Sequence, residues 1–583
     1  MPVGKTLLLR ANAPSAMPKQ DDAALPSDTT AHAAFVYALQ NAQKFGGKAN
    51  PKAIVGMLMK NHPELRDSPK DAAGLADEAV KKVNIMSQQE QQALLESQDE
   101  SALHKTERKE RDLFSSVPVE PGVPVTTAFP PEPSKWPHIG HAKALLINQE
   151  FARRNNGRFL LRFEDTNPAL ARPEFYQQHL DDYAWLGAKF DGIDYASAHM
   201  EEFYRLAERL ITDGNAYICD CPAELMRENR MKGEACGCRS RPADKHLVCW
   251  KSLFSAPAGT AVLRLKVDMQ AKNTTLRDPT MFRIAEGNHA RTGTQYRLWP
   301  SYDFENAVMD GITDVTHRFR SKEFEMRAEL QHRLQDMLSL PRTQTVEFAR
   351  FNLEGVVSSG REIRQLVDGG KLMGWDDPQL TTLAALRRRG FQPVAIREFC
   401  LATGISKAES TLTWDDLMVH NRRFLDATAP RYFFVPDPVV VQVSALPALT
   451  ATVRRHPEND MGSRTFVVKE GGKVLLARAD VARMKQHPGL YRLMGCCNLQ
   501  VTADAVTFAG TALDDYRGQG KGVLQWLPVG VGEDIEVLMP DHDIIAGMAE
   551  PESLSIPVGQ VVQFERFGFV RCDARSRFWF THK

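Results

Sequence analysis

The sequence has no excess of charge of either sign, no long apolar run and few cysteines. Its 583 residues include 73 Lys and Arg against 73 Asp and Glu, so the formal net charge is zero. Proteins that bind nucleic acids often have a basic excess, and this total provides none. No apolar run approaches the roughly 18 residues of a membrane-spanning helix, so we expect no such helix and no membrane partner.

The nine cysteines are an odd number in a long chain. Such sparse use favours reduced thiols or a metal site over a disulfide framework. The N-terminal stretch MPVGKTLLLRANAPSAM contains a run of only three leucines, which is too short for the apolar core of a signal peptide. We therefore expect a cytoplasmic protein, with several domains because a domain averages about 150 residues.

Hydrophobic periodicity divides the chain into helical, mixed and β-rich parts. Apolar residues recur at intervals of three and four between His32 and Leu95, which predicts a small helical domain after a disordered leader. Residues 124–163 have the pattern of strand, helix and strand, a βαβ unit that implies a parallel sheet. After Tyr432, segments such as TFVVKEGGKVLLARA predict strands and hairpins. The predicted fold class is multidomain α/β plus all-β.

The first motif with chemical content is FPPEPSKWPHIGHAKALL, from Phe129 to Leu146. It lies where the first strand of the βαβ unit leads into the helix, an edge at which open α/β sheets bind ligands and a helix N-terminus favours phosphate. His138 and His141 would place two imidazoles within one turn of that end, and Gly140 lets a flat ring approach the backbone. Paired imidazoles can hydrogen-bond phosphate oxygens, although these four residues alone are equally consistent with a histidine pair that binds no ligand.

A second motif is formed by cysteines. Two Cys-x-Cys pairs, Cys219 with Cys221 and Cys236 with Cys238, are separated by PAELMRENRMKGEA. Four thiolates at this spacing suit a tetrahedral zinc ion, and the intervening residues can form a short helix and a turn. The alternative is a reduced cluster that has lost its metal. The other cysteines show no comparable spacing and are expected to be packing residues.

Several strings occur together in one order: HIGH at His138, RFEDTNP at Arg162, GWDDP at Gly374 and LRRRGFQP at Leu386. Together they resemble the class I aminoacyl-tRNA synthetases, in particular the archaeal type of the glutamyl and glutaminyl subgroup. The helical N-terminal segment and the closing strings QFERFGFVR and FWFTHK are also similar to archaeal glutamyl synthetases, so the resemblance covers the whole chain except the leader.

The resemblance implies a Rossmann-type catalytic domain split by an acceptor-stem-binding insertion, and C-terminal β-barrels that bind the anticodon. It implies that ATP and L-glutamate form an aminoacyl adenylate and that tRNA then takes the acyl group on its 3' end. The expected partners are tRNA(Glu), with tRNA(Gln) left open, and the expected cofactors are ATP, magnesium and a structural zinc, in a monomer. The expected divisions are a leader (1–30), an N-terminal helical domain (31–117), two catalytic halves (118–215 and 296–368), the insertion (216–295), a helical stem-contact segment (369–429) and the barrels (430–583).

The resemblance also implies roles for individual residues. The implied ATP-binding residues are Pro131, Glu132, His138, Gly140, His141, Ser358, Ser359, Gly360 and Arg361, of which His138, His141, Ser359 and Arg361 are implied to be catalytic. The implied glutamate contacts are Glu164, Tyr302, Asn306 and Arg320, and the implied tRNA contacts are Arg387, Arg388 and Arg389. The arginine run precedes Gly390 at a predicted helix end, where positive charge also satisfies the helix dipole without a partner.

Arg320 decides between the two amino acids that this subgroup activates. A planar guanidinium can bind a γ-carboxylate through two hydrogen bonds, whereas the glutaminyl enzymes carry a small uncharged residue there. A buried unpaired guanidinium facing an amide would be costly, so the charge favours glutamate. The alternative is that Arg320 lies in an ordinary surface strand.

The sequence departs from the family at three positions. Residues 355–367 stand at the place of the family's mobile Lys-Met-Ser-Lys-Ser loop, and Gly360 takes the place of the second lysine of that loop. Ala128 stands where many members have an arginine, and Lys135 where a glycine is common. Arg361 is a hypothetical replacement for the lost charge, supported by an amide nest at residues 358–360. These departures leave two alternatives open, a glutamine-tRNA ligase and a catalytically silent tRNA-binding homologue. A neutral chain that binds tRNA should also concentrate its basic residues on one face.

Overall fold

A computed structural model describes residues 29–44, 47–62, 65, 68–88, 90–91, 94–95, 112–357, 359–409 and 411–583. The chain forms two compact units, Met1–Asp112 and Leu113–Lys583. The expected leader lies almost wholly outside the described residues, as does most of the charged stretch before Asp112. Within the described ranges, no helix is both long enough and apolar enough to cross a membrane.

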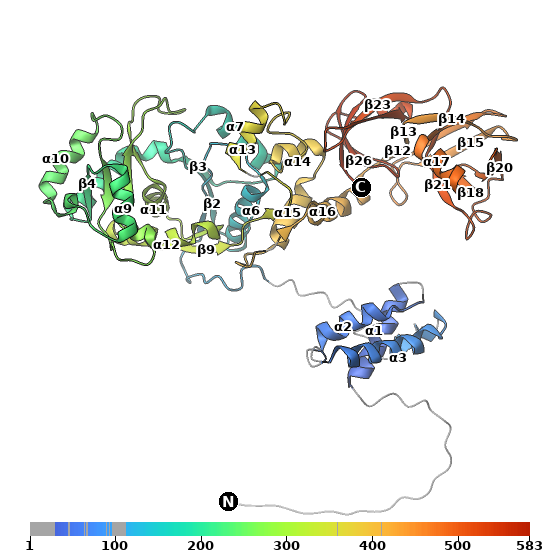
Figure 1. Ribbon diagram of the computed structural model, residues 1–583, viewed down its shortest axis with the longest axis horizontal. Helices are drawn as coiled ribbons and strands as arrows, with labels where there is room; N and C mark the ends of the chain where they lie inside the picture. The colour runs from blue at the N-terminus through green and yellow to red at the C-terminus, as the bar shows by residue number, and fades with distance from the viewer. Residues whose placement is uncertain are drawn as a thin grey trace, which may run out of the picture. The chain divides into compact units, whose positions relative to one another are not determined.

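The first unit is helical, as its periodicity predicts. It contains α1 (Thr29–Lys44), α2 (Pro51–Asn61) and α3 (Pro69–Asn84), which pack on one another (Figure 1). Asn50 begins α2 by accepting a hydrogen bond from the Lys52 backbone N–H at 3.0 Å. Fully buried side chains from all three helices, including Leu39, Leu58 and Val83, form its core.

The second unit is built on a parallel sheet with strand order β3-β2-β1-β8-β9, which confirms the predicted βαβ unit. Helix α6 joins β1 to β2, and α15 packs on α6 (Figure 1). The elements are β1 (Thr126–Phe129), α6 (Ile139–Arg154), β2 (Arg158–Phe163), α7 (Pro173–Trp185), β3 (Gly192–Tyr195), α8 (Met200–Thr212), α11 (Tyr302–Ile312), β8 (His317–Ser321), α12 (Glu325–Met337) and β9 (Gln344–Phe348).

The two central strands part at their carboxyl ends. The register between β1 and β8 holds a single residue pair, Thr127 with His317. Beyond it, buried Asn148 of α6 takes the place of a neighbouring strand: its Nδ2 donates to the Phe319 carbonyl at 2.9 Å, and its Oδ1 accepts from the Phe319 N–H at 3.2 Å. This parting at the carboxyl edge leaves room for a ligand between the strands.

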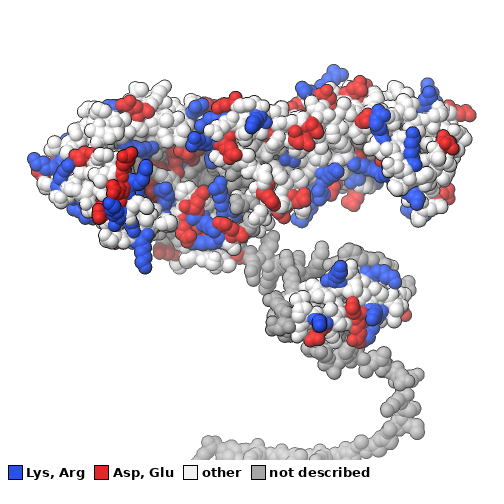
Figure 2. Space-filling model, in the orientation of Figure 1, with Lys and Arg blue, Asp and Glu red and all other residues white. Residues whose placement is uncertain are grey.

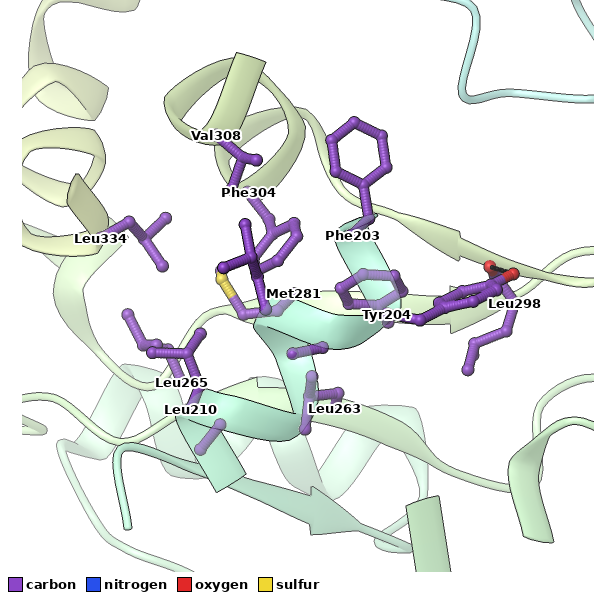
Figure 3. Packing of buried hydrophobic residues seen from close by; sticks show 14 of the residues in the cluster. Phe203, Tyr204, Leu210, Leu263, Leu265, Met281, Leu298, Phe304, Val308 and Leu334 are labelled. Carbon is purple, nitrogen blue, oxygen red and sulfur yellow. Dashed lines mark hydrogen bonds between the residues drawn. The ribbon is translucent and has the colours of Figure 1, made fainter. Parts of the chain in front are cut away.

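A four-stranded antiparallel sheet, ordered β4-β5-β6-β7, interrupts the parallel sheet in sequence between β3 and β8. Figure 3 shows its packing: Leu263 and Met281 of this sheet meet Tyr204 of α8, Phe304 of α11 and Leu334 of α12 in one hydrophobic core. The inserted elements are β4 (Ala216–Cys219), α9 (Ala223–Lys232), α10 (Ala243–Leu253), β5 (Val262–Leu265), β6 (Thr280–Ile284) and β7 (Leu298–Pro300).

A helical segment follows β9 and the short strand β10 (Asn352–Leu353). Its elements are α13 (Gly360–Asp368), α14 (Leu383–Arg389), α15 (Pro393–Ala402), β11 (Thr411–Leu412) and α16 (Trp414–Thr428). Side chains of α14, α15 and α16 share a hydrophobic core with α6, β1 and β2. The helical segment is therefore continuous with the parallel sheet.

From Arg431 onward the chain is β-rich, as predicted, with two hydrophobic cores. Its largest sheet has the order β12-β25-β26-β27-β23-β24-β13. Phe433, Phe434, Trp526 and Trp579 are buried here. The elements are β12 (Arg431–Tyr432), β13 (Phe434–Pro436), β14 (Pro438–Gln442), β15 (Leu449–Arg454), β16 (Ser463–Val468), β17 (Lys473–Ala477), α17 (Arg478–Gln486), β18 (Gly489–Leu493), β19 (Asn498–Val501), β20 (Val506–Phe508), β21 (Gly522–Leu524), β22 (Trp526–Pro528), β23 (Glu533–Leu538), β24 (Ile544–Ala549), β25 (Val561–Phe564), β26 (Gly568–Ala574) and β27 (Arg577–His582).

Replacing Asn148 tests the parting of the central strands. Asn148→Ala should lower the free energy of unfolding by about 2 to 4 kcal/mol, because it leaves the buried N–H and C=O of Phe319 without the amide. Asn155→Ala, at the end of the same helix, removes one bond to the Phe151 carbonyl and should cost about 1 kcal/mol or less. Urea unfolding followed by circular dichroism measures both variants, and equal losses would contradict this role for Asn148.

Candidate active site and cysteine cluster

A cavity of about 640 Å³ opens at the carboxyl edge of the parallel sheet. It brings together motifs that are far apart in sequence: the proline-rich loop after β1, the start of α6, the residues after β2, and the end of β8. Eight of the predicted site residues line it, namely Pro131, Glu132, His138, Gly140, His141, Glu164, Tyr302 and Arg320. The cavity therefore unites the predicted ATP-binding and glutamate-binding groups.

The rings of His138 and His141 both accept backbone hydrogen bonds at the N-terminus of α6. His138 is the N-cap, and its Nδ1 accepts from the Gly140 N–H at 3.0 Å, while the His141 Nδ1 accepts from the His138 N–H at 3.1 Å. Both Nδ1 atoms accept, so the ring proton lies on Nε2 of each neutral imidazole. A Cβ on Gly140 would lie 2.8 Å from the His138 ring, which explains the glycine.

Both imidazoles are electrically neutral at physiological pH. Burial, and then the charge of Lys135, lowers the pKa of His138 to about 3, and burial lowers the pKa of His141 well below its usual value. Each ring therefore offers an Nε2–H donor to a phosphate oxygen and adds no positive charge. Any cation that neutralises a bound phosphate has to come from elsewhere in the cavity.

Glu164 and Asn306 belong to a buried polar network. The Asn306 amide donates to the Glu164 carboxylate and accepts from the Arg318 guanidinium, which also pairs with Asp310 at 2.5 Å. Burial raises the pKa of Glu164 to about 8, against the lowering effect of Arg162. Asn306 does not line the cavity, so it acts on the cavity by fixing Glu164.

Arg320 lies inside the protein, not on a surface strand. It is 7% exposed, and its guanidinium donates to the Gln331 side chain at 2.8 Å and to the Phe324 carbonyl at 3.1 Å. Its Nε has no partner among the described residues. Burial, and then the charge of Arg318, lowers the pKa of Arg320. An anion beside Arg320 would offset both the desolvation of its charge and the repulsion from Arg318.

Arg318 and Glu305 are charged residues of the cavity that the sequence motifs did not single out. Arg318 stands two positions before Arg320 on β8, so strand periodicity places both on one face and offered a signal. Glu305 is fully buried, and neither carboxylate oxygen has a hydrogen-bond partner in the described part of the chain. Burial, and then the charge of Glu164, raises the pKa of Glu305 well above its usual value. Nothing in the local sequence distinguishes Glu305 from an exposed helical residue.

In the loop before α13, Val356 lines the cavity, but the predicted ATP-binding residues at the end of the loop do not. Ser359 caps α13 by accepting from the Glu362 N–H at 3.5 Å, and Arg361 is exposed in the first turn. Neither of these residues, nor Gly360, is among those that line the cavity. Ser358 lies outside the described residues.

The four predicted cysteines come together at the end of β4. Their sulfur atoms all lie within 4.8 Å of one another, with 3.8 Å between Cys219 and Cys236 and 3.6 Å between Cys221 and Cys238. Tetrahedral zinc with Zn–S bonds of about 2.3 Å requires sulfurs about 3.8 Å apart. The Arg264 guanidinium donates to the Cys219 sulfur at 3.8 Å. The cluster therefore fits a closed structural zinc site.

The three predicted tRNA arginines differ in exposure. Arg389 is 2% exposed and donates to the Pro378 and Thr581 carbonyls, and Arg388 pairs with Asp376 and Asp573. The Arg387 side chain is 38% exposed. Figure 2 shows basic and acidic side chains interspersed over the face that it presents, so this face is not the basic surface that the neutral net charge predicts.

Comparison with known proteins identifies the family. The model of the catalytic domain of class I tRNA synthetases (E and Q) matches residues 124–427, and two models of their anticodon-binding domains match residues 429–513 and 524–573. A glutamate tRNA ligase from Elizabethkingia meningosepticum of known structure has a TM-score of 0.40 and 17% identity, covering 53% of this chain and 70% of that one.

Curated relatives match nearly the whole chain. The glutamate-tRNA ligase of Pyrococcus furiosus is 36% identical over 93% of this chain and 96% of its own length. That of Methanothermobacter thermautotrophicus is 36% identical over 94% of this chain and 99% of its own length. These matches confirm the resemblance that the sequence motifs indicated. The chain belongs to the glutamyl and glutaminyl (E and Q) family of class I tRNA synthetases.

Proposed function

We propose that this chain is a glutamate-tRNA ligase. It activates L-glutamate with ATP to glutamyl adenylate and transfers the glutamyl group to the 3' end of tRNA. The relatives that match over most of its length are glutamate-tRNA ligases. The single observation that carries the choice of amino acid is the buried Arg320 guanidinium at the cavity.

Glutamate is held by groups of opposite charge at its two ends. In this proposal Arg320 binds the γ-carboxylate through two hydrogen bonds, with Tyr302 beside it, because an anion relieves the desolvation of the guanidinium. Glu164, fixed by Asn306, receives the α-ammonium group, which favours the ionised carboxylate. Glutamine would present a neutral amide to Arg320 and leave its charge buried without a counterion.

ATP occupies the part of the cavity around α6. Pro131, Glu132 and Gly140 line the space for the nucleotide, and the Nε2–H groups of His138 and His141 donate to phosphate oxygens, at a helix N-terminus that favours negative charge. Activation needs no general base, because glutamate attacks as a carboxylate. The protein accelerates this step by positioning the reactants and stabilising phosphate charge. Magnesium arrives with the ATP phosphates, without a dedicated protein site.

The remaining parts serve tRNA and structure. In this proposal the insertion at 216–295 and the helical segment at 369–429 contact the acceptor stem, with Arg387 the most exposed of the three arginines, and residues 430–583 bind the anticodon. Four cysteines hold a structural zinc that stabilises the insertion. The enzyme acts as a cytoplasmic monomer on tRNA(Glu); charging of tRNA(Gln) depends on anticodon contacts.

Removing the charge of Arg320 tests the choice of amino acid. Arg320→Ala should lower kcat/KM for glutamate-dependent pyrophosphate exchange, measured with tRNA present, by about a hundredfold to several thousandfold, as expected for breaking a buried ion pair. The matched control Arg342→Ala removes an exposed arginine that pairs with Asp336, and should leave exchange within twofold. Unchanged exchange in Arg320→Ala would sink the assignment.

Metal analysis tests the cysteine cluster. Freshly purified protein should contain about one equivalent of zinc, and Cys238→Ser should lose most of it together with thermal stability of the insertion. Cys496→Ser, at a cysteine outside the cluster, should keep the full amount. Less than about half an equivalent in the unmodified protein would argue against a closed zinc site.

A further inference from the structure

Six basic side chains line the cavity: Lys135, Lys143, Arg283, Arg318, Arg320 and Arg350. A bound triphosphate needs positive charge, and the two neutral imidazoles do not supply it. Whether each of the six cations is available to a phosphate depends on the protein groups that it already contacts. A cation held by protein partners must give up those contacts before it can neutralise a phosphate.

Five of the six are already engaged. Arg318 and Arg320 belong to the network around Gln331, and Arg350 pairs with Glu323 at 3.4 Å. Arg283 donates to the Pro300 carbonyl at 2.8 Å, and the Lys143 ammonium donates to the Ala349 carbonyl at 3.1 Å and lies over the rings of Phe348 and Phe351.

Lys135 is the exception. Its ammonium makes no hydrogen bond or ion pair with any residue that the structure describes, although the side chain is half-buried at the cavity. Burial lowers the pKa of Lys135, while the charge of Glu132 partly opposes this effect. A desolvated ammonium without a counterion is costly, and an anionic ligand in the cavity removes that cost.

The position of Lys135 is fixed by its surroundings. Its backbone carbonyl lies 2.9 Å from the His179 Nε2, and the preceding Ser134 carbonyl accepts from Arg364 of α13 at 3.1 Å. Its charge is also the second contributor, after burial, to the low pKa of His138. The ammonium therefore lies near the imidazoles that face the phosphates.

Two departures from the family meet at this point. A Cβ on Gly360, where the family loop has a lysine, would lie 2.8 Å from Cδ and 3.2 Å from Cβ of Lys135. The lysine stem thus occupies the space that a side chain at residue 360 would need. The loop position that lacks the family's lysine and the lysine at residue 135 are therefore in contact with each other.

We propose that Lys135 is a catalytic residue that binds the departing pyrophosphate. As the α-carboxylate oxygen of glutamate forms a bond to the α-phosphorus of ATP, the bond from that phosphorus to the bridging oxygen breaks. Its electron pair goes to pyrophosphate, and the Lys135 ammonium stabilises the added charge without transferring a proton. This role rests on the proposed glutamate-tRNA ligase activity and replaces the charge that Gly360 cannot provide.

Removing the ammonium while keeping the stem tests the proposal. Lys135→Met should lower kcat for glutamate-dependent pyrophosphate exchange by about a hundredfold or more, with KM for glutamate within about threefold. The reason is that the ammonium stabilises the transition state more than the bound substrates. Lys371→Met, at an exposed lysine beyond α13, serves as the control and should behave as the unmodified protein. A Lys135→Met enzyme with kcat within threefold of the unmodified protein would overturn the proposal.

Moving the lysine separates charge from a structural role. The double variant Lys135→Gly with Gly360→Lys should recover at least tenfold in kcat over Lys135→Gly alone, since the ammonium returns from the other side of the same contact. Inorganic pyrophosphate binding, measured by calorimetry, should weaken about tenfold or more in Lys135→Met. The binding measurement needs no amino acid activation. Weakened pyrophosphate binding by Lys135→Met, together with no glutamate-dependent exchange by the unmodified protein, would refute the ligase activity and keep the pyrophosphate site. Normal exchange and unweakened binding in Lys135→Met would refute the role of Lys135.

Discussion

The cavity at the carboxyl edge of the parallel sheet depends on the parting of β1 and β8. A parallel sheet closed by ladder hydrogen bonds would leave no room for a ligand at its centre, and here the ladder ends after Thr127 and His317. The Asn148 side chain satisfies the backbone of Phe319 that the missing ladder would otherwise leave unpaired. Because the Asn148 side chain stands where a neighbouring strand would otherwise pair, a cavity opens between β1 and β8. The N-terminus of α6 lines this cavity, and so do Arg318 and Arg320 of β8.

The chemistry then follows from how charge is distributed around that opening. The histidines at α6 are neutral donors, and Arg318 and Arg320, at the proposed amino acid pocket, are mostly engaged with protein groups. Burial raises the pKa of both acidic groups, Glu164 and Glu305, and the charge of Glu164 raises that of Glu305 further. An arrangement of this kind is unfavourable without ligands, since several charges are desolvated together, and it becomes favourable when a zwitterionic amino acid and a polyphosphate bring the opposite charges.

Local patterns in the sequence predicted the parts of the fold that local forces decide. The βαβ unit, the helix start at His138 and the cysteine spacing were all visible because strands, caps and metal ligands have short-range signatures. Long-range contacts had no such signature. In the sequence, Glu305 looks like an exposed acidic residue of a helix, and Arg389 looks like a solvated arginine at a helix end. In the fold both are buried, and Arg389 donates to the carbonyl of Thr581, which is distant in sequence. The meeting of Lys135 and Gly360 likewise required the folded chain.

Pyrophosphate exchange by the unmodified protein, compared between glutamate and glutamine in the presence of tRNA, tests the central claim most directly. A cavity whose amino acid end carries the buried guanidinium of Arg320 should support exchange with glutamate and discriminate strongly against glutamine. Exchange that proceeds as well with glutamine, or with neither amino acid, would contradict the account.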